Sequence, residues 1–122
     1  MACLIISSGK NAGACYKLDK LPMSAGREVA RDIQIMDPKV SRRHFMIKNG
    51  DDRTSFVVQE QDAKNGVYVN GKKVAEATLK DGDRIVAGET ELTFLLNDDP
   101  ARINEFNRMR QFSPAARAPT IT

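Results

Sequence analysis

The chain has 122 residues, of which 41% are hydrophobic and 29% charged, a composition that is typical of one small globular domain and leaves no room for a second. Its 19 Lys and Arg residues exceed its 16 Asp and Glu residues, and the formal net charge of +3 favours an anionic partner but is too low for a dedicated nucleic-acid binder. Two Cys and one His are too few for a tetrahedral zinc site or a disulfide scaffold. No apolar run is long enough to span a membrane. We therefore expect a cytoplasmic protein without metal or cofactor.

Turn dipeptides divide most of the chain into short segments. Asn-Gly or Asp-Gly pairs begin at Asn49, Asn65, Asn70 and Asp81, and such pairs are preferred in tight turns. The segments between them are rich in β-branched or aromatic residues, which predicts strands. The predicted strands cover residues 3–7, 14–18, 33–36, 44–48, 54–60, 67–69, 84–87 and 91–96. Short strands at this spacing predict an all-β sandwich or barrel.

Alternating residues assign faces to two of these strands. In 91–96, Leu92, Phe94 and Leu96 share one face, which we expect to enter the core because successive side chains point to opposite sides of a strand. In 44–48, Phe45 and Ile47 share a face while the opposite face is partly apolar, which predicts a central strand.

The character of the chain changes after residue 97. Asp99 is a suitable N-cap with Pro following it at the first helical position. Apolar residues then recur at helical spacing at Ile103, Phe106 and Met109. We therefore expect a short helix over residues 98–112. Residues 113–122 contain two prolines and few large apolar side chains, which predicts a disordered tail in which Thr120 or Thr122 is a hypothetical phosphorylation site.

Three motifs follow one another in a fixed order. They are Gly26-Arg27, then Ser41-Arg42-Arg43-His44, and then Asn65-Gly66 with Asn70-Gly71 shortly after. This ordered set resembles the forkhead-associated (FHA) domain, and the resemblance covers residues 1–97. It implies a two-sheet antiparallel β-sandwich that binds phosphothreonine peptides, recruits kinase substrates in signalling and has no enzymatic activity.

The resemblance also implies roles for individual residues. A phosphothreonine has about −1.5 to −2 charges and three acceptor oxygens, so its receptor needs fixed donors and positive charge. The implied phosphate-binding residues are Arg27, Ser41, Arg42 and Lys64, and Asn65 is the residue expected to hold the peptide backbone. Their guanidinium, hydroxyl, ammonium and amide groups can all donate hydrogen bonds. Lys64 stands where the family often has a hydroxyl residue, so we expect phosphate binding to persist with altered selectivity.

Five further motif residues are expected to shape the site rather than contact the ligand. They are Gly26, His44, Gly66, Asn70 and Gly71. Gly26 is expected to let the chain turn so that Arg27 points outward, and the other Gly and Asn residues suit turns because they tolerate positive φ. His44 is a tempting general base, but its place in the motif favours a structural role that joins the Ser41 loop to the sandwich.

Other functions remain open at this stage. The basic residues Arg31, Lys39, Arg42, Arg43 and Lys48 could form a patch for a nucleic-acid backbone. The sandwich could also be an interaction module that does not depend on phosphate. An enzyme is the weakest alternative, because the Ser7 and Lys10 spacing lacks the further motifs of acyl-transfer enzymes.

Overall fold

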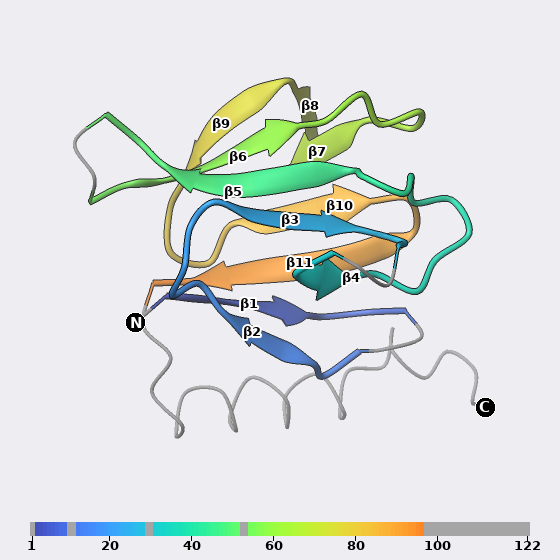
Figure 1. Ribbon diagram of the computed structural model, residues 1–122, viewed down its shortest axis with the longest axis horizontal. Helices are drawn as coiled ribbons and strands as arrows, with labels where there is room; N and C mark the ends of the chain where they lie inside the picture. The colour runs from blue at the N-terminus through green and yellow to red at the C-terminus, as the bar shows by residue number, and fades with distance from the viewer. Residues whose placement is uncertain (1, 10–11, 29–30, 52–53, 97–122) are drawn as a thin grey trace.

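Two β-sheets lie face to face in the computed structural model, which describes residues 2–9, 12–28, 31–51 and 54–96 (Figure 1). The strands are β1 Cys3–Ile6, β2 Cys15–Lys17, β3 Met23–Gly26, β4 Ile33–Gln34, β5 Phe45–Asn49, β6 Phe56–Glu60, β7 Val67–Val69, β8 Lys72–Val74, β9 Glu76–Leu79, β10 Arg84–Ala87 and β11 Thr90–Leu95. One sheet has the order β2-β1-β11-β10-β7-β8, and the other has the order β4-β3-β5-β6-β9. The predicted all-β, two-sheet sandwich is confirmed.

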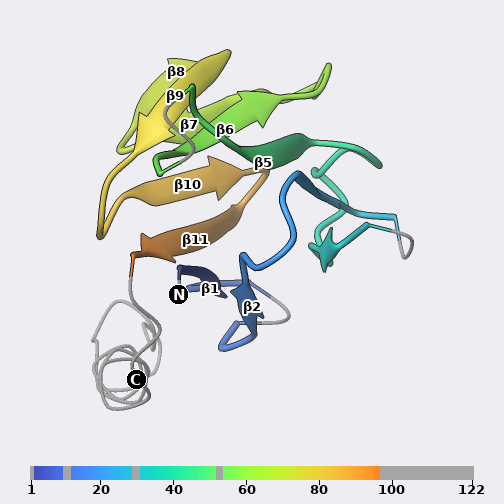
Figure 2. The same cartoon turned by 60° about the vertical axis from the view of Figure 1, so that its left-hand side comes forward.

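Nearly all neighbouring strands are antiparallel. In the six-stranded sheet, β1 pairs with β11 so that Cys3 lies opposite Leu95, and β10 pairs with both β11 and β7 (Figure 2). In the five-stranded sheet, β5 lies between β3 and β6. The exception to the expected antiparallel order is β4, which runs parallel to β3.

The core fills the space between the sheets. Phe45 and Ile47 of β5 and Phe94 of β11 are completely buried, and the Phe56 and Phe94 rings lie 5.4 Å apart between their centroids. Each such side chain contributes about 1.5–3 kcal/mol through burial. The prediction that the 44–48 segment forms a central strand is confirmed, because β5 is the middle strand of its sheet.

Some sequence-based expectations are wrong in detail. Leu92 and Phe94 enter the core as predicted, but Leu96 is 53% exposed because β11 ends at Leu95. The backbone N–H of Leu96 donates to Asp81 Oδ1 at 2.8 Å. On the opposite face of β11, Thr93 and Leu95 are buried as well.

Strands β3, β8 and β9 were not predicted. The predicted helix over 98–112 and the tail over 113–122 lie outside the described residues. Within the part of the chain that the structure describes, no helix is long and apolar enough to cross a membrane.

The two ends of the sandwich differ in what they carry. Figure 1 shows β3 ending and β5 beginning at one end, while β1 begins and β11 ends at the other. The motif residues of the β3–β4, β4–β5 and β6–β7 loops therefore belong to the first end.

Candidate functional site

Strand β3 and the β4–β5 loop approach each other very closely at Gly26. A Cβ built on Gly26 would lie far inside van der Waals contact with the backbone oxygen of Arg42. The next residue, Arg27, donates its backbone N–H to Ser41 O at 3.0 Å. The need for glycine is therefore this backbone contact within a strand, and not the turn that the sequence suggested.

Arg27 is exposed but held at its base. Its Nε donates to the carbonyl oxygen of Val40 at 3.0 Å, so the guanidinium is anchored to the β4–β5 loop. Among the described residues nothing binds the two terminal nitrogens of Arg27. They can donate to an anion above the loop, as the planar guanidinium group does well.

Ser41 and Lys64 connect the β4–β5 loop to the β6–β7 loop. The backbone N–H of Lys64 donates to Ser41 Oγ at 3.0 Å. Because the hydroxyl oxygen is the acceptor in that bond, the Ser41 hydroxyl hydrogen can still be donated to a ligand. The exposed Lys64 side chain adds an ammonium group from the second loop.

His44 is completely buried beneath these loops. Its Nδ1 accepts from the backbone N–H of Ser41 at 3.0 Å, which leaves Nε2 as the protonated nitrogen that donates to Gly66 O at 2.7 Å. Burial lowers the pKa of His44 below 6.5, against smaller opposing effects of the Gly66 carbonyl and the charges of Glu60 and Asp37. This neutral imidazole joins two loops and is not exposed as a general base would be.

Asn65 and Arg42 are both exposed at the rim. The Asn65 side-chain nitrogen donates to Lys39 O at 2.8 Å, which fixes the amide plane. Its carbonyl oxygen makes no hydrogen bond within the described residues and can meet the N–H of a bound peptide. The carbonyl of Arg42 accepts from Glu28 N at 3.4 Å, while its guanidinium extends into solvent.

A buried carboxylate that the sequence analysis missed supports the β4–β5 loop. Asp37 Oδ1 accepts from Lys39 N at 2.9 Å, and Oδ2 accepts from Glu89 N at 2.8 Å and Thr90 Oγ1 at 2.9 Å. Burial raises the pKa of Asp37, but these hydrogen bonds and the Lys39 charge outweigh burial and leave the pKa below 3.8. The Asp-Pro-Lys sequence was a usable signal, because an Asp often accepts the N–H two residues on.

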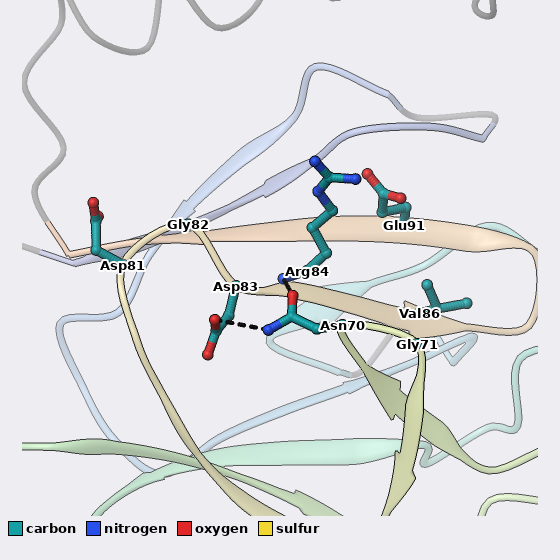
Figure 3. A pocket seen from close by; sticks show the side chains of 8 residues that line it. All are labelled: Asn70, Gly71, Asp81, Gly82, Asp83, Arg84, Val86 and Glu91. Carbon is teal, nitrogen blue, oxygen red and sulfur yellow. Dashed lines mark hydrogen bonds between the residues drawn. The ribbon is translucent and has the colours of Figure 1, made fainter.

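Asn70 and Gly71 form a turn that belongs to a different part of the molecule. Asn70 has φ of 51°, and its side chain binds Asp83 Oδ1 and the Arg84 N–H, each at 3.0 Å (Figure 3). The pocket around this turn is lined by Asn70, Gly71, Asp81, Gly82, Asp83, Arg84, Val86 and Glu91. The structure thus brings together the predicted ligand-binding residues and leaves Asn70 and Gly71 apart from them.

Carboxylates neutralise much of the basic patch that could have met a nucleic acid. Lys39 Nζ lies 2.9 Å from Glu89, and Lys48 Nζ lies 3.6 Å from Glu76. Arg31 lies 3.1 Å from Glu28. The bond to Glu89 raises the pKa of Lys39 above 10.5. Arg27, Arg42 and Lys64 make no such ion pair in the part of the chain described, so the motif loops keep uncompensated positive charge.

Rigid β-strands thus present an anchored guanidinium, a hydroxyl and an ammonium from neighbouring loops, which is the chemistry of an anion-binding module rather than of a catalytic centre. The model of the FHA domain family matches residues 23–88, a span that includes all of these groups. The chain belongs to the FHA family.

Two relatives of the chain are named as a regulator and an inhibitor. The chain is 40% identical over 96 residues to the glycogen accumulation regulator GarA of Mycolicibacterium smegmatis, covering 77% of this chain and 58% of that protein. It is 40% identical over 96 residues to the oxoglutarate dehydrogenase inhibitor of Corynebacterium efficiens, covering 77% of this chain and 65% of that protein. The chain therefore spans less than two thirds of the length of these relatives.

Solved structures of FHA domains have the same fold. One, from a study of phosphothreonine-dependent FHA interactions, gives a TM-score of 0.70 at 27% identity and covers 79% of this chain and 96% of its own. Another is EmbR of Mycobacterium tuberculosis in complex with a low-affinity phosphopeptide. It gives a TM-score of 0.68 at 32% identity and covers 79% of this chain and 24% of its own.

Proposed function

We propose that residues 1–97 form a phosphothreonine-binding domain that recruits kinase-phosphorylated proteins in signalling and carries out no catalysis. The observation that carries the proposal is the convergence of Arg27, Ser41 and Lys64. Arg27 is anchored through Val40 O at 3.0 Å, and Ser41 Oγ accepts the Lys64 N–H at 3.0 Å. Their remaining donors all belong to one end of the sandwich.

In the proposed complex each residue has a separate task. The terminal nitrogens of Arg27 and the hydroxyl of Ser41 donate to phosphate oxygens, while Arg42 and Lys64 add positive charge. Charge-assisted hydrogen bonds contribute about 1.5–3 kcal/mol each. Two or three of them therefore suffice to separate a phosphorylated peptide of micromolar affinity, near −8 kcal/mol, from an unphosphorylated peptide too weak to detect.

Asn65 is proposed to hold the peptide backbone beside the phosphate. Its amide nitrogen is already fixed on Lys39 O at 2.8 Å, so the carbonyl oxygen is oriented before the peptide arrives. Pre-orientation of this kind reduces the entropy lost on binding.

The names of the relatives, a glycogen accumulation regulator and an oxoglutarate dehydrogenase inhibitor, support a regulatory role exerted by binding a partner protein.

Fluorescence anisotropy with a degenerate phosphothreonine peptide library tests this function. We expect binding to phosphothreonine peptides and none to matched unphosphorylated peptides, with phosphoserine peptides as the second comparison. Arg27→Ala should abolish binding. Arg84→Ala is the matched control, because it removes another exposed Arg side chain from β10, outside the motif loops.

Two results would contradict the proposal. Binding that is indifferent to peptide phosphorylation and to Arg27→Ala would point to a phosphate-independent interaction module. Equal losses in Arg27→Ala and Arg84→Ala would show that general positive charge, and not the phosphate site, attracts the peptide.

A further inference from the structure

The side chain of Lys73 lies over the β6–β7 loop, although Lys73 belongs to strand β8. A Cβ built on Gly66 would lie 2.8 Å from Lys73 Cε and 3.6 Å from Lys73 Nζ. The methylene chain of Lys73 therefore occupies the space that a side chain at Gly66 would need, and Gly66 is buried. Gly66 directly follows Asn65, the residue proposed to hold the peptide backbone. The Lys73 ammonium is thus placed beside the proposed peptide site.

The pairing of β7 with β8 explains the position of Lys73. Lys73 lies opposite Tyr68, and Gly66 stands two residues before Tyr68, next to the start of β7. Long side chains reach the diagonal neighbours across a pair of strands. Val67 and Val69 belong to the core, so Tyr68 and the residue opposite it point outward. Lys73 therefore extends along the outer face of the sheet toward the motif loops.

The Lys73 ammonium can take an anionic partner. Lys73 is exposed and makes no ion pair with any residue that the structure describes, whereas Lys39 and Lys48 have carboxylates at 2.9 and 3.6 Å. The support under its methylene chain is fixed, because the Gly66 carbonyl oxygen accepts from His44 Nε2 at 2.7 Å. A charge held over a fixed loop loses less conformational freedom when it pairs with a ligand.

We propose that Lys73 selects phosphothreonine peptides that carry an Asp or Glu close to the phosphothreonine, by pairing its ammonium with that carboxylate. The inference rests on the proposed phosphothreonine binding and names the class of peptide that the same site prefers. An extended peptide advances about 3.3 Å per residue, and Lys73 covers the residue next to Asn65. The acidic side chain therefore belongs within about three residues of the phosphothreonine.

Phosphothreonine peptides that differ at one position test this selection by fluorescence anisotropy. Glu, Gln or Lys is placed in turn at each of the three positions before and after the phosphothreonine, in an otherwise uncharged sequence. We expect the Glu peptide to bind the wild-type protein about threefold to fivefold more tightly than the Gln peptide at one or two positions, which is the range of an exposed ion pair. At the same positions the Lys peptide should bind more weakly than the Gln peptide.

Variants of β8 show which lysine produces the preference. Lys73→Gln should bring the affinities for the Glu and Gln peptides together at these positions, and Lys73→Glu should reverse the order in favour of the Lys peptide. A purely structural role of the side chain would not reverse the preferred charge. Lys72→Glu is the matched control, because Lys72 is also exposed on β8 but lies opposite Val69, on the other face of the strand. It should keep the wild-type preference.

The inference falls, while the proposed function stands, in two cases. In the first, binding depends on phosphothreonine and on Arg27, but the Glu and Gln peptides bind alike at every position. In the second, Lys73→Glu and Lys72→Glu change the preference equally, which would show that the general charge of the domain attracts acidic peptides. Failure of the function is a separate result, because peptides would then bind regardless of phosphorylation or not at all, and the inference would fall with it.

Discussion

The neutral imidazole of His44 makes hydrogen bonds to two loops at once. The Ser41 N–H donates to Nδ1 at 3.0 Å, and Nε2 donates to Gly66 O at 2.7 Å. Protonation would place a second N–H at Nδ1 against the Ser41 N–H, so the ring cannot take up a proton without losing that bond. The geometry of Ser41, and through it of Lys64, depends on the neutral form.

This arrangement predicts acid sensitivity near neutral pH. Burial lowers the pKa of His44 below the unfolded value of 6.5, despite opposing effects of Gly66, Glu60 and Asp37. Below 6.5 the unfolded chain therefore binds a proton that the folded chain does not, and the free energy of unfolding falls as pH falls, by at most about 1.4 kcal/mol per pH unit. Because His44 is the sole His, denaturant titrations between about pH 7.5 and about pH 5.5 isolate this effect.

The matched variant is His44→Gln. Its amide can accept from Ser41 and donate to Gly66 without titrating, so its free energy of unfolding should be nearly constant over the same range. A wild-type protein as insensitive to pH as His44→Gln, or a variant as sensitive as the wild type, would refute this account of His44.

At the scale of elements, the end of the sandwich with the motif loops depends on a connection between the β4–β5 loop and the β10–β11 turn. Asp37 accepts from Lys39 N in its own loop, from Glu89 N in the turn and from Thr90 Oγ1 at the start of β11. The carbonyls of Lys39 and Val40 in the same loop hold Asn65 and Arg27. Loss of the carboxylate should therefore affect both stability and binding.

Asp37→Asn is expected to lower the free energy of unfolding by about 2–3 kcal/mol at neutral pH, because in either orientation the amide nitrogen replaces an acceptor and leaves at least one buried donor without its partner. It should also weaken phosphopeptide binding, measured by anisotropy. The folded pKa of Asp37 lies below 3.8, so its contribution is present above that pH and is lost as pH falls through the folded pKa. The variant has no carboxylate to protonate at this position, so its free energy of unfolding should not show this part of the decrease at low pH.

Asp19→Asn is the control for this prediction, since Asp19 is exposed. The variant should match the wild type in chemical denaturation and in peptide binding. Equal stability of the Asp37→Asn and Asp19→Asn proteins would rule out the proposed connection between the loop and the turn.

The elements that could be predicted from sequence are those with a strong local pattern. Strands such as β5 and β7 have buried apolar residues at alternate positions, Phe45 and Ile47 in one and Val67 and Val69 in the other, and Asn-Gly turns adjoin them. Strand β3 was missed because Met23–Gly26 contains no β-branched residue, and its place is fixed by pairing with β5 and by the Gly26 contact. Strands β8 and β9 are the outer strands of their sheets and carry Lys and Glu, which protect exposed sheet edges but weaken the strand pattern.

The side chains of the candidate site could be predicted from the sequence, but their arrangement in space could not. The ordered motifs indicated Arg27, Ser41 and Lys64, whose ligand-binding roles remain predictions. The supports that orient them are backbone carbonyls, such as Val40 O and Lys39 O, which have no sequence pattern. The close approach of Gly26 to Arg42 O likewise depends on two segments meeting in space.

For the whole molecule, the distribution of charge separates a phosphopeptide-binding domain from a nucleic-acid binder. The net charge is only +3, and Lys39, Lys48 and Arg31 are paired with Glu89, Glu76 and Glu28. These three belong to the five basic residues considered for a nucleic-acid surface, so their pairing leaves that candidate patch few cations to neutralise successive phosphates of a nucleic-acid backbone. A single phosphate dianion needs only the groups at the motif loops.

This distribution predicts a shallow dependence of binding on salt. Between about 50 mM and about 200 mM NaCl we expect the phosphopeptide Kd to rise by less than about tenfold, whereas a protein that contacts six to ten nucleic-acid phosphates loses about 10³–10⁵ in affinity over that range. Arg43→Ala removes an exposed cation outside the proposed phosphate site and should leave the salt slope unchanged. Duplex DNA should not displace the bound peptide in the same anisotropy assay. A steep slope that Arg43→Ala reduces, together with displacement by DNA, would assign the basic residues to a nucleic-acid surface, because only contacts with many phosphates release enough counterions to produce it.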